Sequence, residues 1–178
     1  MKQIDFENGT ITQNIFMAAI PMLVAQVLSL LYNIVDRIYI ARIPGVGTTA
    51  LGAVGLCFPV IMIITAFSNL FGSGGAPLFS IERGRGNLEN AGRILNTSFS
   101  MLALASIVLM LAGLIFARPI LTLFGASADA LTYAYPYLMI YLLGTFPSMI
   151  STGMNPFINA QGYATTGMLS VVLGAVAN

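Results

Sequence analysis

An acidic residue, Asp36, lies inside an apolar stretch that is long enough to cross a membrane. The stretch runs from Pro21 to Ile43, and apolar residues continue beyond Asp36 and its neighbour Arg37. Because an ionised side chain near the bilayer centre costs about 2.5–3.5 kcal/mol on insertion scales, such a carboxylate needs protein or water beside it. A carboxyl group in that setting can exchange a proton or hold a sodium ion, so Asp36 is a candidate functional carboxylate.

The other polar residues of this stretch share one side of the predicted helix with Asp36. At about 100° per residue they fall within an arc of roughly 100° and form a first polar stripe: Gln26, Ser29, Asn33, Asp36 and Arg37. Asn33 could supply a further oxygen ligand if the ion is sodium. We expect the first polar stripe to face other helices or a water-filled cavity. The alternative is an interfacial position, where Arg37 extends to the lipid headgroups and Asp36 offsets its charge.

A second polar stripe follows further along the chain. Its members recur at steps of three and four residues within an arc of roughly 80°: Tyr141, Thr145, Ser148, Thr152, Asn155 and Asn159. Hydrogen bonds between helices would explain this pattern, and so would the wall of a cavity for cargo. In the second case the two stripes should face a common space, bordered by the flexible thioethers of Met149 and Met154.

The composition restricts both the fold class and the chemistry. Of 178 residues, 57% are hydrophobic and 7% are charged, which predicts an all-α polytopic protein in contact with the lipid bilayer. A net charge of +1 with dispersed basic residues offers no surface for nucleic acid. The chain has no histidine and one cysteine, Cys57, so zinc, haem and Ser-His chemistry lack their groups. We therefore expect neither an enzyme nor a cofactor, and Cys57 is expected to serve in packing.

The hydrophobic pattern divides the chain into spans joined by short turns. We predict four complete transmembrane helices and the start of a fifth, which together make one partial amino-terminal lobe over residues 1–178: 14–43, 49–81, 94–117, 130–160 and the incomplete 166–178. Pro21 is expected to bend the first helix, and Arg118-Pro119 to end the third. The last segment is too short to cross a membrane, so we expect a fragment or a truncated product.

Two further patterns concern packing and orientation. Small residues in the second span favour close helix packing: Gly72, Gly74 and Gly75. The polar segment 82–93 holds three of the seven basic residues, and Lys2 lies on the same side of the predicted membrane. Because cytoplasmic loops carry an excess of lysine and arginine, this predicts a cytoplasmic amino terminus in a cell-membrane protein.

The order of several motifs resembles that of the multidrug and toxic compound extrusion (MATE) family over essentially all 178 residues. The motifs are Tyr32-Asn33-Ile34-Val35-Asp36-Arg37-Ile38, the Arg83-Gly84-Arg85-Gly86-Asn87 turn, Arg118-Pro119 with Phe124-Gly125-Ala126, and Asn159-Ala160-Gln161-Gly162. The resemblance implies the first lobe of a twelve-helix antiporter. Such an antiporter exports small organic cations or amphiphiles in exchange for protons or sodium, and a missing carboxy-terminal lobe would complete it.

The resemblance also assigns roles to individual residues. Asp36 resembles the first-span carboxylate that binds the coupling ion, and Asn178 resembles the fifth-span asparagine that faces it. Pro21 resembles the proline at which the first helix bends when the ion state changes. Two alternatives stay open: a non-transporting membrane fragment or assembly module, and a related flippase for lipid-linked sugars. Flippase cavities usually carry several basic residues, where this chain offers Arg37.

Overall fold

The computed structural model describes residue 4 and residues 10–177, and this part of the chain consists of helices joined by short turns. The helices are α1 (Ile11–Ala41), α2 (Gly47–Gly84), α3 (Leu88–Leu123), α4 (Ala128–Leu143), α5 (Thr145–Ala160) and α6 (Ala164–Ala177). Three of them, α1, α2 and α3, are long and apolar enough to cross a membrane. The predicted all-α membrane fold is confirmed. Lys2 and Asn178, used above for the orientation and the ion site, lie outside the described residues.

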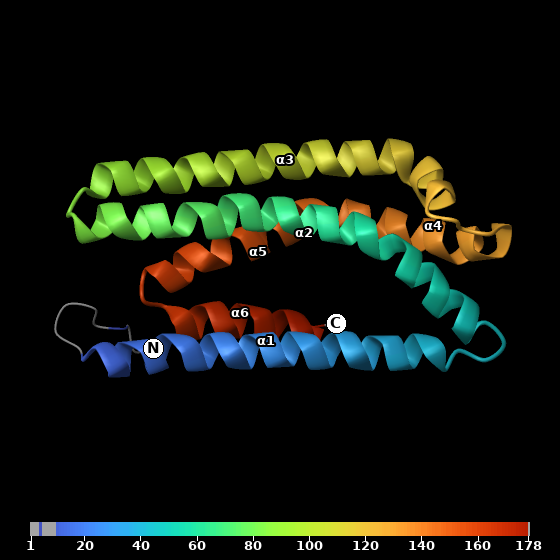
Figure 1. Cartoon of the computed structure of the whole chain (residues 1–178), viewed down its shortest axis with the longest axis horizontal. Helices are drawn as coiled ribbons and strands as arrows, with labels where there is room; N and C mark the ends of the chain where they lie inside the picture. The colour runs from blue at the N-terminus through green and yellow to red at the C-terminus, as the bar shows by residue number, and fades with distance from the viewer. Residues whose placement is uncertain (1–3, 5–9, 178) are drawn as a thin grey trace.

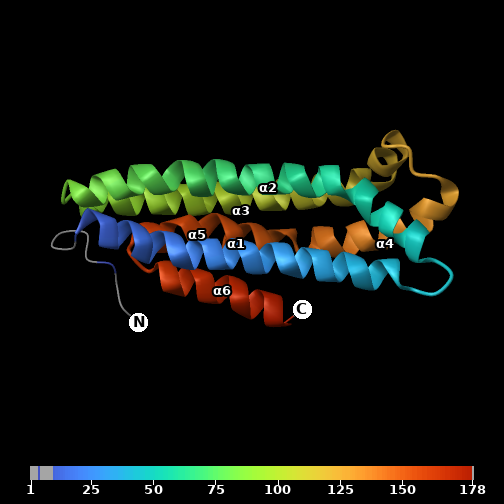
Figure 2. The same ribbon diagram turned by 60° about the horizontal axis from the view of Figure 1, so that its bottom comes forward.

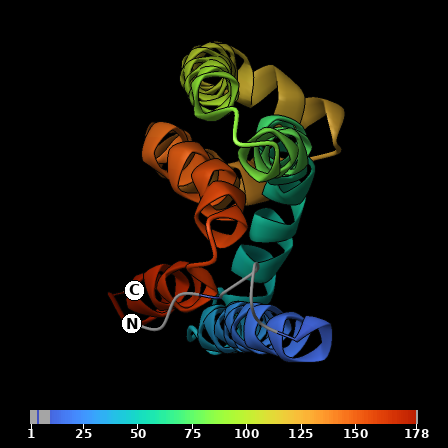
Figure 3. The same cartoon turned by 90° about the vertical axis from the view of Figure 1, so that its left-hand side faces the viewer.

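The helices are arranged in two layers (Figure 1). One layer holds α1 and α6, which pack against each other, and Figure 2 shows them side by side from a second direction. The end-on view of Figure 3 separates this α1–α6 layer from α2, α3 and α5. With α4, these three helices make up the second layer, which we call the α2–α5 block.

The α2–α5 block has an apolar core made of two clusters, and Met154 packs against both. Its fully buried large side chains come from α3, α4 and α5: Leu102, Leu121, Leu138, Leu142, Met149 and Phe157. Polar links join the helices within this core. The buried hydroxyl of Ser68 donates to the Met149 carbonyl oxygen at 3.2 Å, and the Cys57 thiol donates to the Ala134 carbonyl oxygen at 3.5 Å. Cys57 therefore packs, as its apolar surroundings predict.

The described side chains of the α1–α6 layer form no comparable core. No residue of α1 is buried, and large apolar side chains such as Leu23 and Leu30 are 63% and 61% exposed. The guanidinium of Arg37 lies 5.5 Å from the ring centroid of Phe58 in α2, a cation–π contact between the layers. Because these exposed apolar side chains need a nonaqueous neighbour, they fit contact with lipid or with further helices.

Residues 130–160, predicted as one span, form the two helices α4 and α5, each of 16 residues. The break falls at Gly144, which caps both helices. Three residues later, Pro147 has no N–H to donate to the Leu143 carbonyl, and its ring crowds that carbonyl. The helical pattern on either side is the predicted one, but the proline divides it.

The other prolines have different outcomes. Pro119 lies inside α3, which continues to Leu123, so the prediction that it ends the third span is wrong. The last turns of α3 veer aside instead (Figure 1).

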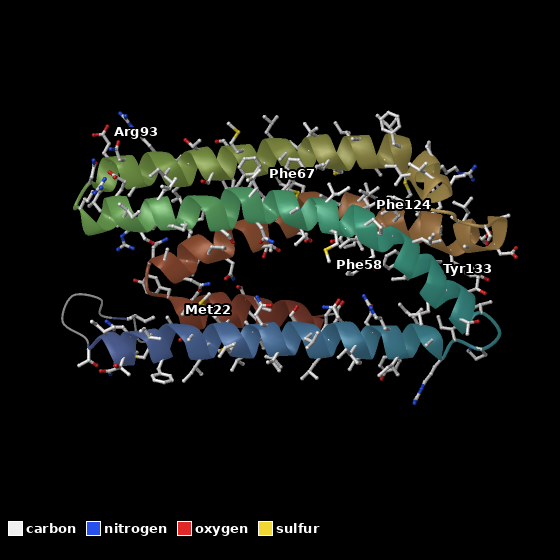
Figure 4. The ribbon with its side chains drawn as sticks, viewed as in Figure 1. Met22, Phe58, Phe67, Arg93, Phe124 and Tyr133 are labelled. Carbon is white, nitrogen blue, oxygen red and sulfur yellow. The ribbon has the colours of Figure 1, made fainter. Side chains whose placement is uncertain are left out.

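α2 bends beside Phe58, next to Pro59, where it passes from one layer to the other (Figure 4). α1 runs straight through Pro21 (Figure 1), so the bend expected there is absent from this conformation.

Glycines permit the close approach of α2 to its neighbours. A Cβ atom added at Gly72 would collide with the backbone of Gly153 in α5, and one added at Gly75 would collide with Ser98 of α3. Close packing is therefore confirmed for these two glycines of the predicted cluster. A Cβ atom at Gly74 would meet nothing within 4 Å, so Gly74 lies on an open face of α2.

Candidate functional site

A polar cavity of about 400 Å³ lies between the α1–α6 layer and the α2–α5 block. Its polar lining comes from four helices: Gln26 and Ser29 of α1, Asn69 and Ser73 of α2, Ser151, Thr152, Asn155 and Asn159 of α5, and Ser170 of α6. The first and second polar stripes both contribute to this one cavity. Met22 also lines it and points from α1 toward the other helices (Figure 4).

Asparagines hold α5 to α6 beside the cavity. The Asn155 side-chain amide donates to the Gly167 carbonyl oxygen at 3.0 Å and to the Ser170 hydroxyl at 3.1 Å. The Asn159 amide donates to the Asn155 side-chain oxygen at 3.1 Å. Hydrogen bonding between helices, one of the two explanations of the second polar stripe, therefore accounts for part of it.

One acceptor of this network has no donor. The side-chain oxygen of Asn159 is buried and accepts no hydrogen bond from the described part of the chain. An unpaired buried acceptor costs about 1–3 kcal/mol. A Cβ atom at Gly167 would collide with this oxygen, so only a glycine lets α6 approach here. The oxygen is enclosed by α6 at Gly167, so a donor could reach it only if α6 moved away from α5.

Part of the second polar stripe lies away from the cavity. Thr145 is fully buried, and its hydroxyl donates to the Tyr141 carbonyl oxygen of its own turn at 3.3 Å. Tyr141 packs against the apolar core, and Ser148 is exposed outside the cavity lining. These positions precede or adjoin the break at Gly144, so an arc drawn for one continuous helix does not apply to them.

The cavity also includes polar residues that the sequence patterns did not single out. They are Asn69 and Ser73 of α2 and Ser151 of α5. The spacing of Asn69 and Ser73, one helical turn apart on the span that carries the glycine cluster, is a signal that could have identified them.

Asp36 lies outside the cavity lining but faces the α2–α5 block. It is partly buried in α1, and its carboxylate is close enough to Tyr137 of α4 to interact electrostatically with the phenol. The two ion pairs in the described part of the chain lie at the end of α2 and the start of α3, so neither involves Asp36. Arg37, beside it in sequence, stacks on Phe58 instead. The carboxylate is thus near the other layer without being neutralised by Arg37.

Asn33 is exposed, and its amide donates to the Ser29 carbonyl oxygen at 2.7 Å, which leaves its side-chain oxygen for another partner. No group of three or more His, Cys, Asp or Glu side chains converges within the described residues. A sodium ion at Asp36 would therefore rely on amide, hydroxyl and backbone oxygens. Asn178, the other residue assigned to this ion, lies outside the described part.

Pro21 belongs to a separate, mostly apolar hollow of about 520 Å³ at the amino-terminal end of α1. Ile4 and Thr165 also line it. Ile4 is buried, and its backbone N–H donates to the Gly162 carbonyl oxygen in the α5–α6 turn at 3.1 Å. The chain before α1 thus reaches the α5–α6 turn beside Pro21.

Membrane-length apolar helices around a polar cavity define a multi-pass membrane protein that can hold a small molecule between its spans. Sequence comparison agrees with this class. The MepA multidrug export protein of Staphylococcus haemolyticus is 26% identical over 170 residues, which cover 94% of this chain and 37% of that protein. The FAD transporter of Shewanella oneidensis is 24% identical over 160 residues, covering 90% and 35%. The probable multidrug resistance protein YoeA of Bacillus subtilis is 25% identical over 169 residues, covering 89% and 34%.

Solved structures match the same part of the chain. The crystal structure of MATE in complex with MaD5 has a TM-score of 0.89 and 27% identity, and the match covers 99% of this chain and 39% of that one. The outward-facing conformation of a multidrug resistance MATE family transporter of the MOP superfamily has a TM-score of 0.88 and 26% identity, covering 99% and 38%. The chain therefore spans between a third and two fifths of the length of these relatives.

The MatE family model matches residues 21–178, and this chain belongs to that family. The relatives above are named as exporters, transporters or resistance proteins, so the family is one of transporters rather than enzymes.

Proposed function

We propose that this chain is the amino-terminal part of a secondary antiporter that exports small cationic or amphiphilic compounds in exchange for protons or sodium. The observation that carries the proposal is the polar cavity between the two layers. Among the described residues, its lining offers amides and hydroxyls from α1, α2, α5 and α6, but no charged side chain. Such a lining can hydrogen-bond to varied cargo, and the thioethers of Met22 and Met168 adapt to its shape.

The absence of charge from the lining also bears on the class of cargo. An ionised cargo of either sign needs opposite charge beside it in a site that excludes water, because an unpaired charge is costly there. This lining therefore suits the uncharged part of an amphiphile, and a cationic group would need an acid outside it. The related lipid-linked sugar flippase is disfavoured for the same reason, since Arg37 is engaged with Phe58 outside the lining.

In this proposal Asp36 is the site of ion exchange. A carboxylate that is partly buried near Tyr137, without an ion pair to Arg37, can be neutralised by a proton or a sodium ion. Asn33 and Asn178 would add oxygen ligands if the ion is sodium. A straight α1 would then bend at Pro21 when the carboxylate is neutralised. The positions of Asp36 and Asn33 in the structure support their roles. The roles of Asn178 and Pro21 are supported by the family resemblance.

The test is Asp36→Asn in a transporter that joins this chain to a carboxy-terminal lobe of the family. We expect loss of efflux driven by a proton or sodium gradient, while expression and insertion stay at the level of the unchanged protein. Asp129→Asn is the matched control, because Asp129 is an exposed acid in the first turn of α4. Efflux retained by Asp36→Asn would refute ion exchange at this residue. Failure of the unchanged protein to export any compound would favour a non-transporting module.

We further propose a cell-membrane location with the α2–α3 turn and the amino terminus in the cytoplasm. The support is the basic excess of residues 82–93, which contain Arg83, Arg85 and Arg93. Asn87→Cys, made together with Cys57→Ala, should resist a membrane-impermeant thiol reagent in intact cells and react after permeabilisation. Labelling from outside intact cells would invert the proposed topology.

A further inference from the structure

A second concave surface lies outside the polar cavity, between α2 and α3. It consists of two adjoining hollows of about 390 and 320 Å³, which share Leu78, Arg93 and Ile94. The first hollow is at the α2–α3 turn, and the second continues along both helices as far as Leu70. Neither shares a lining residue with the polar cavity. We call the two adjoining hollows together the α2–α3 groove.

The chemistry of the α2–α3 groove changes along its length. At the turn it is lined by Arg85, Arg93 and Asn90 together with Glu82. Arg93 projects outward from α3 at this end (Figure 4). Further along, the lining is apolar or small, as at Leu70 and Gly74. A molecule that fills the groove would thus be polar at one end and apolar over the rest.

The charges at the turn leave arginine donors for an anion. The Glu82 carboxylate accepts from Arg85 Nη1 at 2.9 Å and from the Asn90 amide at 3.4 Å, so this acid is already satisfied. Arg93 pairs with Glu89 at 2.7 Å, but both side chains are more than 70% exposed. Exposed pairs of this kind hold their partners weakly. A guanidinium binds phosphate through parallel hydrogen bonds, so Arg93 and the remaining donors of Arg85 suit that group.

The length of the α2–α3 groove matches one leaflet of a membrane. From Leu70 to Arg85 the helix rises about 22 Å at 1.5 Å per residue. The hydrocarbon of one leaflet is about 15 Å thick, and the headgroup region adds about 5–7 Å. The arginines would therefore lie at the headgroups when Leu70 lies near the bilayer centre.

The surface of the groove is open at Gly74. A Cβ atom at Gly74 would meet nothing within 4 Å, in contrast to its neighbour Gly75. No neighbouring helix packs against Gly74, so its missing side chain leaves room for an atom of a bound molecule. An acyl chain lying against α2 would occupy that room.

We propose that the α2–α3 groove binds a phospholipid with an anionic headgroup. Its phosphate would accept hydrogen bonds from Arg85, Arg93 and Asn90, and one acyl chain would lie along Leu78, Gly74 and Leu70. The polar turn, the arginine donors that its two ion pairs leave over, and the one-leaflet length carry the proposal together. It does not depend on the cargo or on the coupling ion.

Fluorescence quenching can measure this binding, because the chain has no tryptophan of its own. Leu70→Trp places a reporter in the groove. Leu104→Trp is the matched reporter on α3, 61% exposed and outside both hollows. Each variant of the 178-residue chain is incorporated into phosphatidylcholine bilayers, and brominated phosphatidylglycerol or brominated phosphatidylcholine is added in increasing amounts. We expect phosphatidylglycerol to be preferred at least about fivefold at Leu70→Trp, and neither lipid to be preferred at Leu104→Trp.

Second substitutions separate the headgroup from the acyl chain. Arg93→Gln should reduce the preference at Leu70→Trp to about that of the Leu104→Trp reporter, whereas Arg118→Gln, the same change at the far end of α3, should leave it unchanged. Gly74→Leu should weaken quenching by both brominated lipids at Leu70→Trp. Equal preference at the two reporters, or a preference that survives Arg93→Gln, would overturn the proposal. So would absence of quenching at Leu70→Trp, which would mean that protein covers the groove.

Discussion

The α2–α5 block and the α1–α6 layer are both made of apolar helices, yet they are held together in different ways. The block buries leucines completely and brings Phe79 and Phe157 edge to face at 5.6 Å. No residue of α1 is buried, and a cation–π contact from Arg37 helps to hold it to the block. Because local stability follows buried apolar contact, the block should behave as a rigid wall and α1 as the element that moves. The polar cavity lies where the two meet.

The largest effect is expected from a change that forces the block apart. Gly72→Val places a side chain against the backbone of Gly153, which cannot yield as a flexible side chain would. Overpacking of this kind costs about 1–3 kcal/mol. We expect the unfolding midpoint in detergent to fall clearly when helicity is followed by circular dichroism.

Gly74→Ala is the matched control, since its Cβ atom has open space and alanine favours a helix over glycine by about 1 kcal/mol. Equal destabilisation by both substitutions would show that the close approach at Gly72 does not hold the block together.

A smaller effect is expected in the cavity wall. Thr152→Leu removes a hydroxyl from the lining of the polar cavity without touching Asp36. A lost hydrogen bond of about 0.5–1.5 kcal/mol should weaken export of hydrogen-bonding compounds roughly threefold to tenfold, with ion coupling preserved. The measurement is a panel of efflux rates in a complete transporter, with Thr132→Leu, exposed near the start of α4, as control. A lower protein yield with an unchanged compound profile would make Thr152 a structural residue.

The smallest effect concerns the attachment of α1. Phe58→Leu removes the ring on which Arg37 stacks, a contact worth about 0.5–1 kcal/mol at exposed sites. Amide hydrogen exchange in α1 should accelerate while exchange in α3 stays the same. Phe67→Leu, which changes an exposed ring of the same helix, should leave both unchanged. Faster exchange throughout the chain would mean that the two layers unfold together.

The contrast between the layers also shows how far the sequence could predict the structure. Apolar periodicity identified the helical spans, and the polar stripes identified Gln26, Ser29, Thr152 and Asn155 as residues that line one cavity. The span and the polar side of each helix depend on local geometry within a single helix, which the order of residues determines, whereas the meeting of the two stripes depends on how the helices pack.

The effects of three prolines on their helices were predicted wrongly from the sequence. Pro147 divides the predicted fourth span, Pro119 is retained inside α3, and α1 passes Pro21 without a bend. A proline removes the same hydrogen bond at each position, so the outcome depends on the neighbouring helices. The tertiary arrangement decides this, and for the same reason Thr145 faces the core rather than the cavity.

The most direct test of the central claim, that α1 and α5 face one cavity open to cargo, is paired cysteine labelling. Ser29→Cys and Thr152→Cys are made separately in a Cys57→Ala chain, incorporated into bilayers and exposed to a water-soluble maleimide with and without ethidium. The arrangement predicts that both cysteines react and that ethidium slows both to a similar extent, while Leu104→Cys, outside the cavity lining, reacts little in either case. Reaction of only one of the two, or protection of neither by ethidium, would contradict a shared cavity.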